Sequence, residues 1–329
     1  MNAVITLKIH SRPLYLYKVL AALAKCRNIN KYPLIISQDD VASPTIKHQN
    51  REAIEWSGIE GAVKEFYYIA HDQTAPLGCA GHTKFCLDQT FRVAEADFAF
   101  HLEDDTLPSQ DLIEYWEQVG PILDSDFDKY FAACTFHRPC HRPRYEKFQD
   151  LMALNEEGYQ NVELSKLSKY GPEYEEFIEG IGEDGNVLVA KKWFDASGGF
   201  AMCKKQWDRI NEMGGMFGIS YLSEKGRRFE CRGQEWLKEI RRAENGGFAW
   251  PFNSYFAENK STIYPWVSIV KNIGKSGTHV LDETLYNSIH RNNVWWGHFD
   301  LKTRGTIPYD VDNIIQDDSK YIEHGIQDD

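Results

Sequence analysis

Three consecutive carboxylates, Glu103, Asp104 and Asp105, follow the short apolar run 98–102, in which His101 is the one polar side chain. An apolar run of strand type that ends in acids is typical of a buried strand that delivers charge at the edge of a sheet. Adjacent like charges repel one another and lose hydration at a large cost, so a hard divalent cation suits them as a partner. Such a cation usually brings phosphates with it.

The acidic triplet also has a simpler interpretation, a solvated cluster on a helix face or in a loop. The flanking sequence favours the first interpretation, because residues 106–109 (Thr-Leu-Pro-Ser) break the chain before a helix-like pattern opens at 111–116. A strand followed by acids, a turn and a helix is the order found at sites on the carboxyl edge of an α/β sheet.

The elements that must position these acids alternate along the first third of the chain. Ser11 is predicted to cap the first helix, with Pro13 in its first turn. Strands are predicted at 4–9, 32–37, 63–69 and from 98, and helices at 14–26, 46–57 and 84–94. This order predicts an α/β fold with a mostly parallel central sheet and helices on both faces.

The chain of 329 residues is long enough for one large core. We expect a single domain over 1–299, with a nucleotide-binding half at about 1–120 and an acceptor half at about 185–299. A polar, tyrosine-rich stretch at about 138–184 reads as an insertion or lid, and 300–329 as an acidic tail. Short strands are also predicted at 186–190 and 197–203.

Charge and cysteine content indicate the setting. The net charge of −12 argues against a protein whose whole surface binds polyanions. The two basic segments at 137–144 and 227–242 are interpreted as solvated surface. The seven cysteines have no framework spacing, which fits reduced thiols. No signal-peptide pattern or membrane-spanning run is found in the sequence, and a cytoplasmic protein of bacterial or viral style is expected.

Several segments together resemble the nucleotide-sugar glycosyltransferases of the GT-A fold, most closely the N-acetylglucosaminyltransferase I type. In matching order they are Ser11-Arg12, Ser37-Gln38-Asp39, His82-Thr83-Lys84-Phe85 and the DXD-like Glu103-Asp104-Asp105. Farther on, 193–202 resembles a strand carrying acceptor-side glycines, and 272–279 resembles the Asn-Ile-Gly…Thr-His ending of bacterial sugar transferases.

The resemblance implies a Mn²⁺ or Mg²⁺ ion that bridges the two phosphates of a nucleotide sugar and acts as a Lewis acid. It implies Asp105 as the metal ligand, with His279 as a second ligand or a charge beside the phosphates. The implied donor-binding residues are Arg12, Asp39, His82, Glu103, Asp104, Gly198 and Gly199. Two simpler roles stay open: Asp39 as a helix N-cap before Val41, and His82 as a buried, satisfied histidine.

An inverting transferase needs a base to take the proton of the acceptor hydroxyl. Glu235, in Gln234-Glu235-Trp236, is the candidate, because the related family has an acid pair followed by tryptophan at this place. Glu235 as a solvated helix acid is the competing interpretation, and a retaining enzyme would need no dedicated base.

The leading hypothesis is therefore a metal-dependent hexosyl- or N-acetylhexosaminyltransferase that uses a UDP-sugar and an acceptor glycan or glycolipid. A runner-up is a viral enzyme that glycosylates a hydroxylated pyrimidine in DNA, with the basic segments holding phosphates. Two further hypotheses are a non-catalytic nucleotide-sugar-binding module and a nucleotidyltransferase. Against the nucleotidyltransferase, Ser11-Arg12-Pro13 stands where a glycine-rich phosphate loop would follow the first strand.

Overall fold

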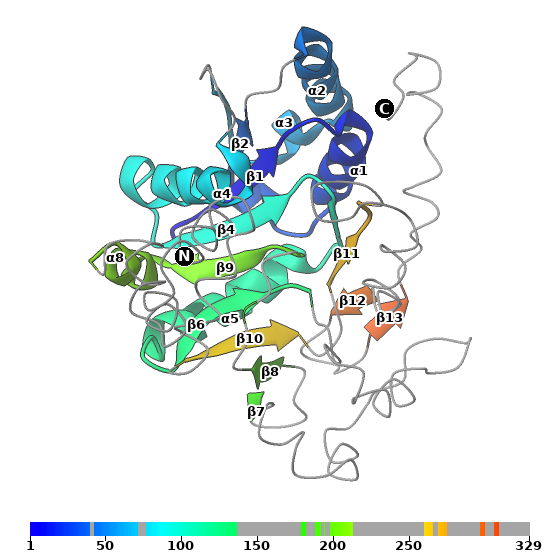
Figure 1. The fold of residues 1–329 in the computed structure, drawn as a ribbon. Coiled ribbons are helices and arrows are strands. Elements are labelled where there is room, and N and C mark those ends of the chain that lie inside the picture. Colours follow the sequence, from blue (N-terminus) through cyan, green and yellow to red (C-terminus); the bar gives the residue numbers. More distant parts are fainter. Residues whose placement is uncertain are drawn as a thin grey trace, which may run out of the picture.

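A computed structural model gives the fold of the chain, and its elements carry the labels of Figure 1. The structure describes residues 1–39, 43–71, 77–136, 179–181, 188–191, 194, 198–212, 260–265, 269–274, 297–299 and 306–308.

Helices and strands alternate through the first 136 residues. The helices are α1 (Pro13–Leu23), α2 (Pro44–Ser57), α3 (Ile59–Ala62), α4 (Gly78–Asp88), α5 (Leu112–Ser125) and α8 (Lys204–Glu212), with a 3₁₀ turn η1 (Ile29–Lys31) and a π turn η2 (Gln89–Val93). The strands are β1 (Ala3–Ile9), β2 (Pro33–Gln38), β3 (Glu65–Ala70), β4 (Phe98–Glu103), β5 (Thr106–Pro108), β6 (Tyr130–Cys134), β7 (Glu179–Ile181), β8 (Leu188–Lys191), β9 (Phe200–Cys203), β10 (Ser261–Pro265), β11 (Val270–Asn272), β12 (Gly297–Phe299) and β13 (Thr306–Pro308).

One nine-stranded sheet organises these elements, in the order β3-β2-β1-β4-β9-β6-β10-β8-β7 (Figure 1). Strands β3, β2, β1 and β4 pair in parallel, and β9 is antiparallel to both of its neighbours, β4 and β6. Strands β6 and β10 are parallel, whereas β8 runs against both β10 and β7. Only β9 and β8 therefore oppose the common direction. The predicted α/β class with a mostly parallel sheet is confirmed.

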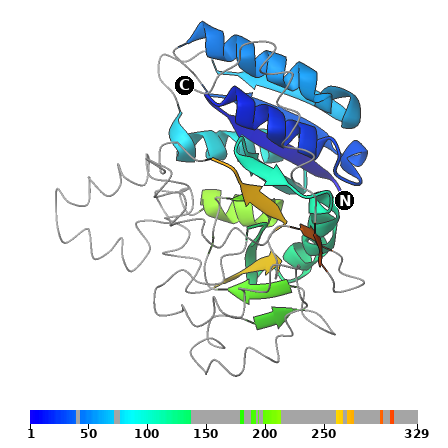
Figure 2. The ribbon, with the colours of Figure 1, turned by 90° about the vertical axis from the view of Figure 1, so that its right-hand side faces the viewer.

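Alternate residues of the strands face opposite helical layers, as the two-residue period of a strand requires. The odd residues of β1 and the even residues of β4 belong to the main apolar core with α1, α2 and α5. The ring of Phe100 stacks on that of Trp116 from α5, with centroids 4.8 Å apart. Figure 2 shows α1 and α2 lying side by side on this face of the sheet.

The second face of the sheet carries α4, η2 and α8. Here Lys8 of β1 reaches Thr83 of α4, and Trp207 of α8 stacks on Phe91 of η2. Helices therefore cover both faces, as predicted from the order of elements.

Two predicted helix starts were wrong. The first helix has Arg12 at its N-cap position with no side-chain capping bond, while Ser11 Oγ lies 3.0 Å from His10 Nδ1 instead. The helix predicted from residue 84 begins at Gly78, because its first backbone N–H groups are capped by Asp39 from a distant part of the chain. Strand β6 was not predicted.

The later chain is described only in part. Strand β9 lies within the predicted strand at 197–203. Strand β8 overlaps the predicted strand at 186–190 and ends one residue later. Thr306–Pro308, within the predicted acidic tail, pairs antiparallel with Gly297–Phe299. The predicted domain boundaries stay predictions. In the described part of the chain, no helix has the length and apolar character to cross a membrane.

Candidate metal and donor site

Four of the predicted site residues meet at the carboxyl edge of the sheet. Arg12 follows β1, Asp39 follows β2, and Asp104 and Asp105 follow β4. Since β2, β1 and β4 are adjacent and parallel, their carboxyl ends lie at one edge, where ligands of such sheets usually bind. The structure therefore places these four residues at the same edge of the sheet, and their roles toward a metal or a donor stay predictions.

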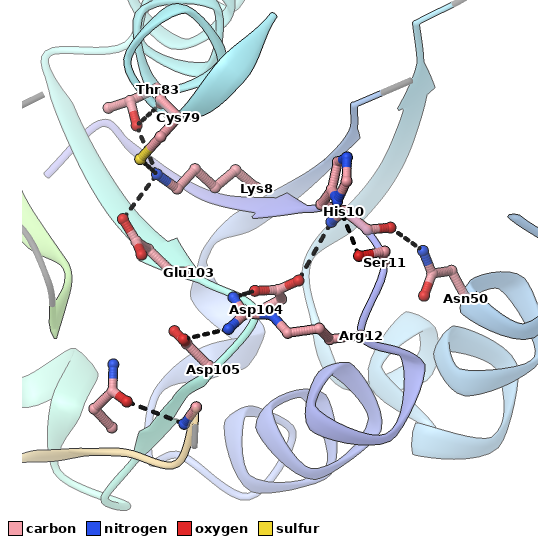
Figure 3. A network of polar contacts seen from close by, with 12 residues as sticks. Lys8, His10, Ser11, Arg12, Asn50, Cys79, Thr83, Glu103, Asp104 and Asp105 are labelled. Atoms are coloured by element: carbon pink, nitrogen blue, oxygen red, sulfur yellow. Dashed lines mark hydrogen bonds and ion pairs between the residues drawn. The ribbon is translucent and has the colours of Figure 1, made fainter. Parts of the chain in front are cut away.

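Arg12 bridges the two aspartates (Figure 3). Its Nη1 lies 2.6 Å from Asp105 Oδ2, and its Nη2 pairs with Asp104 Oδ1. Burial alone would lower the pKa of Arg12, but the two carboxylates outweigh it and raise that pKa. Asp104 Oδ2 also accepts a hydrogen bond of 3.3 Å from the backbone N–H of His10. One guanidinium thus ties the end of β1 to the end of β4.

The turn that carries Arg12 is held in place by two buried amides. Gln38 Nε2 and Asn50 Nδ2 both donate to the backbone carbonyl of His10, at 3.0 and 2.7 Å. Asn50 Nδ2 also donates to Gln38 Oε1 at 2.7 Å. Asn50 was not identified from the sequence, because nothing in its helical context marks it as part of the edge.

One carboxylate oxygen of Asp105 has no partner in the part of the chain that the structure describes. Oδ2 pairs with Arg12, whereas Oδ1 is buried and has no hydrogen-bond partner among the described residues. A buried acceptor of this kind is costly unless a ligand satisfies it. Mg²⁺ and similar ions are commonly held by one or two carboxylates together with substrate phosphates. Asp105 Oδ1 therefore fits the implied metal as a protein ligand.

A second segment closes over Asp105. The backbone N–H of Ile273 donates to the Asp105 carbonyl at 2.9 Å, and β11 pairs with β5 directly after the acids. Asn272 Oδ1 accepts from the Gly274 N–H at 3.0 Å, which holds the turn. A methyl group at Gly274 would overlap Asp105 Oδ2 and lie 3.0 Å from Arg12 Nη1. Glycine is thus required for this close approach.

Glu103 is engaged by a lysine that the sequence analysis missed. Lys8 and Glu103 are register partners in β1 and β4, and their Nζ and Oε1 atoms lie 2.8 Å apart. The same ammonium donates to Cys79 Sγ and Thr83 Oγ1, both at 3.1 Å (Figure 3). Burial raises the pKa of Glu103, with Lys8 opposing the rise. A lone charged residue, Lys8, inside an otherwise uncharged parallel strand was the available signal.

Asp39 caps a helix, although not the next helix in the sequence. Its two oxygens accept from the N–H groups of Leu77 and Gly78, at 2.8 and 3.2 Å. The helix that follows Asp39 directly is capped by Ser43, whose Oγ accepts from Ile46 N. The contact of Asp39 with a uracil stays a prediction.

His82 lies inside the interface between α4 and the sheet. Its side chain is buried, and its Nε2 lies 2.8 Å from Ser37 Oγ. Burial, with the nearby positive charge of Lys8, lowers its pKa to about 3. These features match a buried, satisfied histidine, and a nucleotide contact of His82 stays a prediction.

Gly198 and Gly199 have packing reasons to be glycine. A Cβ at Gly198 would overlap the side chain of Phe136. Gly199 has a φ of +87°, and a Cβ there would lie 2.5 Å from the backbone oxygen of His101. Both residues therefore fix β9 against its neighbours. Their contact with a donor stays a prediction.

Two predicted residues, Glu235 and His279, lie outside the described residues, as do both basic segments. Within the described part of the chain, no group of three or more His, Cys, Asp or Glu side chains is arranged to hold a metal ion. Since His279 lies outside the described residues, Asp105 is the one predicted metal ligand whose geometry the structure describes.

No protein-family model and no curated protein matches the sequence. Among solved structures, the chain is similar to S. aureus TarS 1-349, with 9% identity and a TM-score of 0.41, over 80% of this chain and 60% of that one. It is similar to a mannosyltransferase from Pyrobaculum calidifontis in complex with GDP-Man and Mn²⁺, with 11% identity and a TM-score of 0.38, over 65% and 47%. It is also similar to the galactosyltransferase LgtC in complex with donor and acceptor sugar analogs, with 11% identity and a TM-score of 0.40, over 92% and 99%.

The chain spans less than two thirds of the first two of these structures. Nothing in them supports the narrower resemblance to the N-acetylglucosaminyltransferase I type.

Proposed function

We propose that the chain is a metal-dependent GT-A glycosyltransferase that transfers a sugar from a nucleoside diphosphate, UDP in the first instance, to an acceptor hydroxyl. The observation that carries the proposal is the buried Oδ1 of Asp105 beside the Arg12 guanidinium, an oxygen that no described residue pairs with. At this sheet edge the anionic oxygen of Asp105 suits a metal ion, and the Arg12 cation suits a diphosphate.

The residues at this edge divide into roles by their charge and contacts. Asp105 would hold Mn²⁺ or Mg²⁺, which when bound supplies Lewis-acid stabilisation of the leaving diphosphate. Arg12 would pair with phosphate oxygens through its two-pronged guanidinium. These two assignments rest on the ion pair and on the free carboxylate oxygen.

Glu103 and Asp104 would accept hydrogen bonds from sugar or ribose hydroxyls, because ionised carboxylates have several acceptor positions. The Glu103 side chain is 20% exposed and uses Oε1 for Lys8. Asp104 is held more tightly, by Arg12 and by the His10 N–H. Of the two, Glu103 is therefore better placed to meet a ligand without giving up its structural contacts.

The acceptor side of the proposal rests on the sequence. A glycan or glycolipid acceptor, Glu235 as base and His279 beside the phosphates are all proposals of this kind. Donor contacts of Asp39, His82, Gly198 and Gly199 belong with them. The hypothesis of a DNA acceptor depended on the two basic segments, and none of the described residues favours it.

A screen of nucleotide sugars by thermal shift with Mn²⁺ tests the proposal. A ligand that binds only the folded state stabilises it, by about 2.7 kcal/mol at one hundred times its Kd. We expect a UDP-sugar to raise Tm with Mn²⁺ present and EDTA to abolish the shift. The nucleotide sugar that binds is then incubated with the protein and candidate acceptors.

The product of that incubation separates the reaction classes. Release of UDP supports the transferase, whereas release of pyrophosphate identifies a nucleotidyltransferase. Binding without turnover on any acceptor or water identifies a non-catalytic module. No stabilisation by any nucleotide sugar with Mn²⁺ would contradict the proposal.

A further inference from the structure

The candidate metal ligand is already paired with a cation of the protein. Arg12 uses two nitrogens at once, Nη1 on Asp105 at 2.6 Å and Nη2 on Asp104. The aspartate side chains are only 10% and 5% exposed, so their charges are poorly screened by solvent. In the absence of a ligand, the guanidinium supplies the positive charge that the acids need.

A divalent cation at Asp105 would therefore lie close to the Arg12 charge. Like charges a few ångströms apart repel strongly where the effective dielectric constant is low. Residues 273–274 limit the room for both, because Ile273 bonds the Asp105 backbone and Gly274 approaches its side chain. A metal ion without an added anion is thus opposed by the protein itself.

We propose that Arg12 and the divalent cation compete for Asp105, and that the donor diphosphate relieves this competition by taking Arg12 onto its own oxygens. Metal and nucleotide then bind with strong positive coupling, and each binds weakly alone. This inference rests on the proposed function. Before the donor binds, Arg12 opposes metal binding at Asp105, and after the donor binds, Arg12 contacts the diphosphate.

The structure allows the side chain of Arg12 to move while its backbone stays in place. The side chain is 25% exposed, more than either aspartate, and it makes no capping bond to α1. Its carbonyl accepts from Leu16 N at 3.0 Å. The carbonyl of His10, two residues before Arg12, is held by Gln38 and Asn50. The guanidinium also lies 5.8 Å from the centre of the Tyr15 ring. A change of the Arg12 rotamer over a fixed backbone is the movement that the inference requires.

The test measures Mn²⁺ binding to the full chain by electron paramagnetic resonance, with and without UDP. In the native protein, UDP should tighten Mn²⁺ binding by roughly 5- to 150-fold, the usual range of coupling between sites. Arg12→Gln removes the competing charge, so it should bind Mn²⁺ alone more tightly than the native protein and lose most of the coupling. Arg12→Lys keeps the charge and should keep weak binding of Mn²⁺ alone.

Arg27→Gln is the matched control, because Arg27 also bridges two acids, Asp111 and Glu114. It should leave both Mn²⁺ affinities unchanged, and near-UV circular dichroism verifies that each variant is folded. The inference alone is overturned if the native protein binds Mn²⁺–UDP but Arg12→Gln binds Mn²⁺ alone no more tightly. It is overturned too if Arg12→Lys binds Mn²⁺ alone as tightly as Arg12→Gln. If the native protein binds neither Mn²⁺ nor UDP when both are present, the proposed function fails with it.

Discussion

Replacing Gly274 by alanine inserts one methyl group into the contact between the chain segment after β11 and the acid pair. The new Cβ would overlap Asp105 Oδ2 and come within 3.0 Å of both Asp105 Cβ and Arg12 Nη1. Either Asp105 must leave Arg12, or residues 272–274 must move away from β5. Both responses disturb the place where the metal and diphosphate are proposed to bind.

The cost follows from the contacts that must give way. Extra methyl groups in a well-packed site cost about 1–3 kcal/mol. A hydrogen bond to a charged group contributes about 1.5–3 kcal/mol, so loss of the Arg12–Asp105 bond falls in the same range. We expect Gly274→Ala to lower the free energy of unfolding by about 1–3 kcal/mol. We also expect it to weaken Mn²⁺-dependent UDP binding by about tenfold or more, since 1.4 kcal/mol corresponds to a factor of ten.

Urea unfolding at pH 7 and calorimetric titration of UDP with Mn²⁺ provide the two readouts. Gly61→Ala is the control, because Gly61 lies in α3 and a Cβ there meets nothing within 4 Å. Alanine at that helical position should be neutral or stabilise by up to about 1 kcal/mol. Native-like stability and native-like UDP binding in Gly274→Ala would refute the placement of this segment over Asp105.

Two further predictions concern the buried polar groups behind the edge. In the folded protein the pKa of His82 is lowered to about 3, whereas in the unfolded chain it is near 6.5. Between these two pH values the unfolded chain binds one more proton than the folded protein. The free energy of unfolding therefore falls by about 1.4 kcal/mol for each pH unit as the pH drops toward 3. His82→Gln should remove that part of the slope in urea titrations from pH 7 to 4.5, with the exposed His48→Gln as control; an unchanged slope would contradict it. Lys8→Met leaves the Glu103 carboxylate, 20% exposed, without its partner and should destabilise by about 3 kcal/mol in urea unfolding. The further change Glu103→Gln should recover much of this loss; equal stabilities of the single and double variants would argue against the ion pair.

The position of the site at one sheet edge was predictable from the sequence for a topological reason. Strands separated by helices pair in parallel, so the residues that follow them converge whatever their separation along the chain. Arg12, Asp39 and the acid pair at 104–105 each follow such a strand. Apolar runs and their endings were therefore enough to bring them together.

The partners within the site were not predictable, because each depends on contacts between distant parts of the chain. The Lys8–Glu103 pair requires the register of β1 against β4. Asp39 caps a helix that begins 39 residues later, rather than the next helix in sequence. Local spacing carries no information on either choice. Gly274 likewise contacts Asp105 only through the pairing of β11 with β5.

Calorimetric titration of UDP into the native protein and into Asp105→Asn, each with Mn²⁺ and with EDTA, tests the central claim most directly. Asn keeps the shape of the side chain but removes the charge of the proposed ligand. Asp208→Asn, on the exposed surface of α8, is the control. We predict Mn²⁺-dependent binding in the native protein and in Asp208→Asn, and its loss in Asp105→Asn. Binding that is independent of Mn²⁺, or undiminished in Asp105→Asn, would contradict the assignment of Asp105 as the metal ligand.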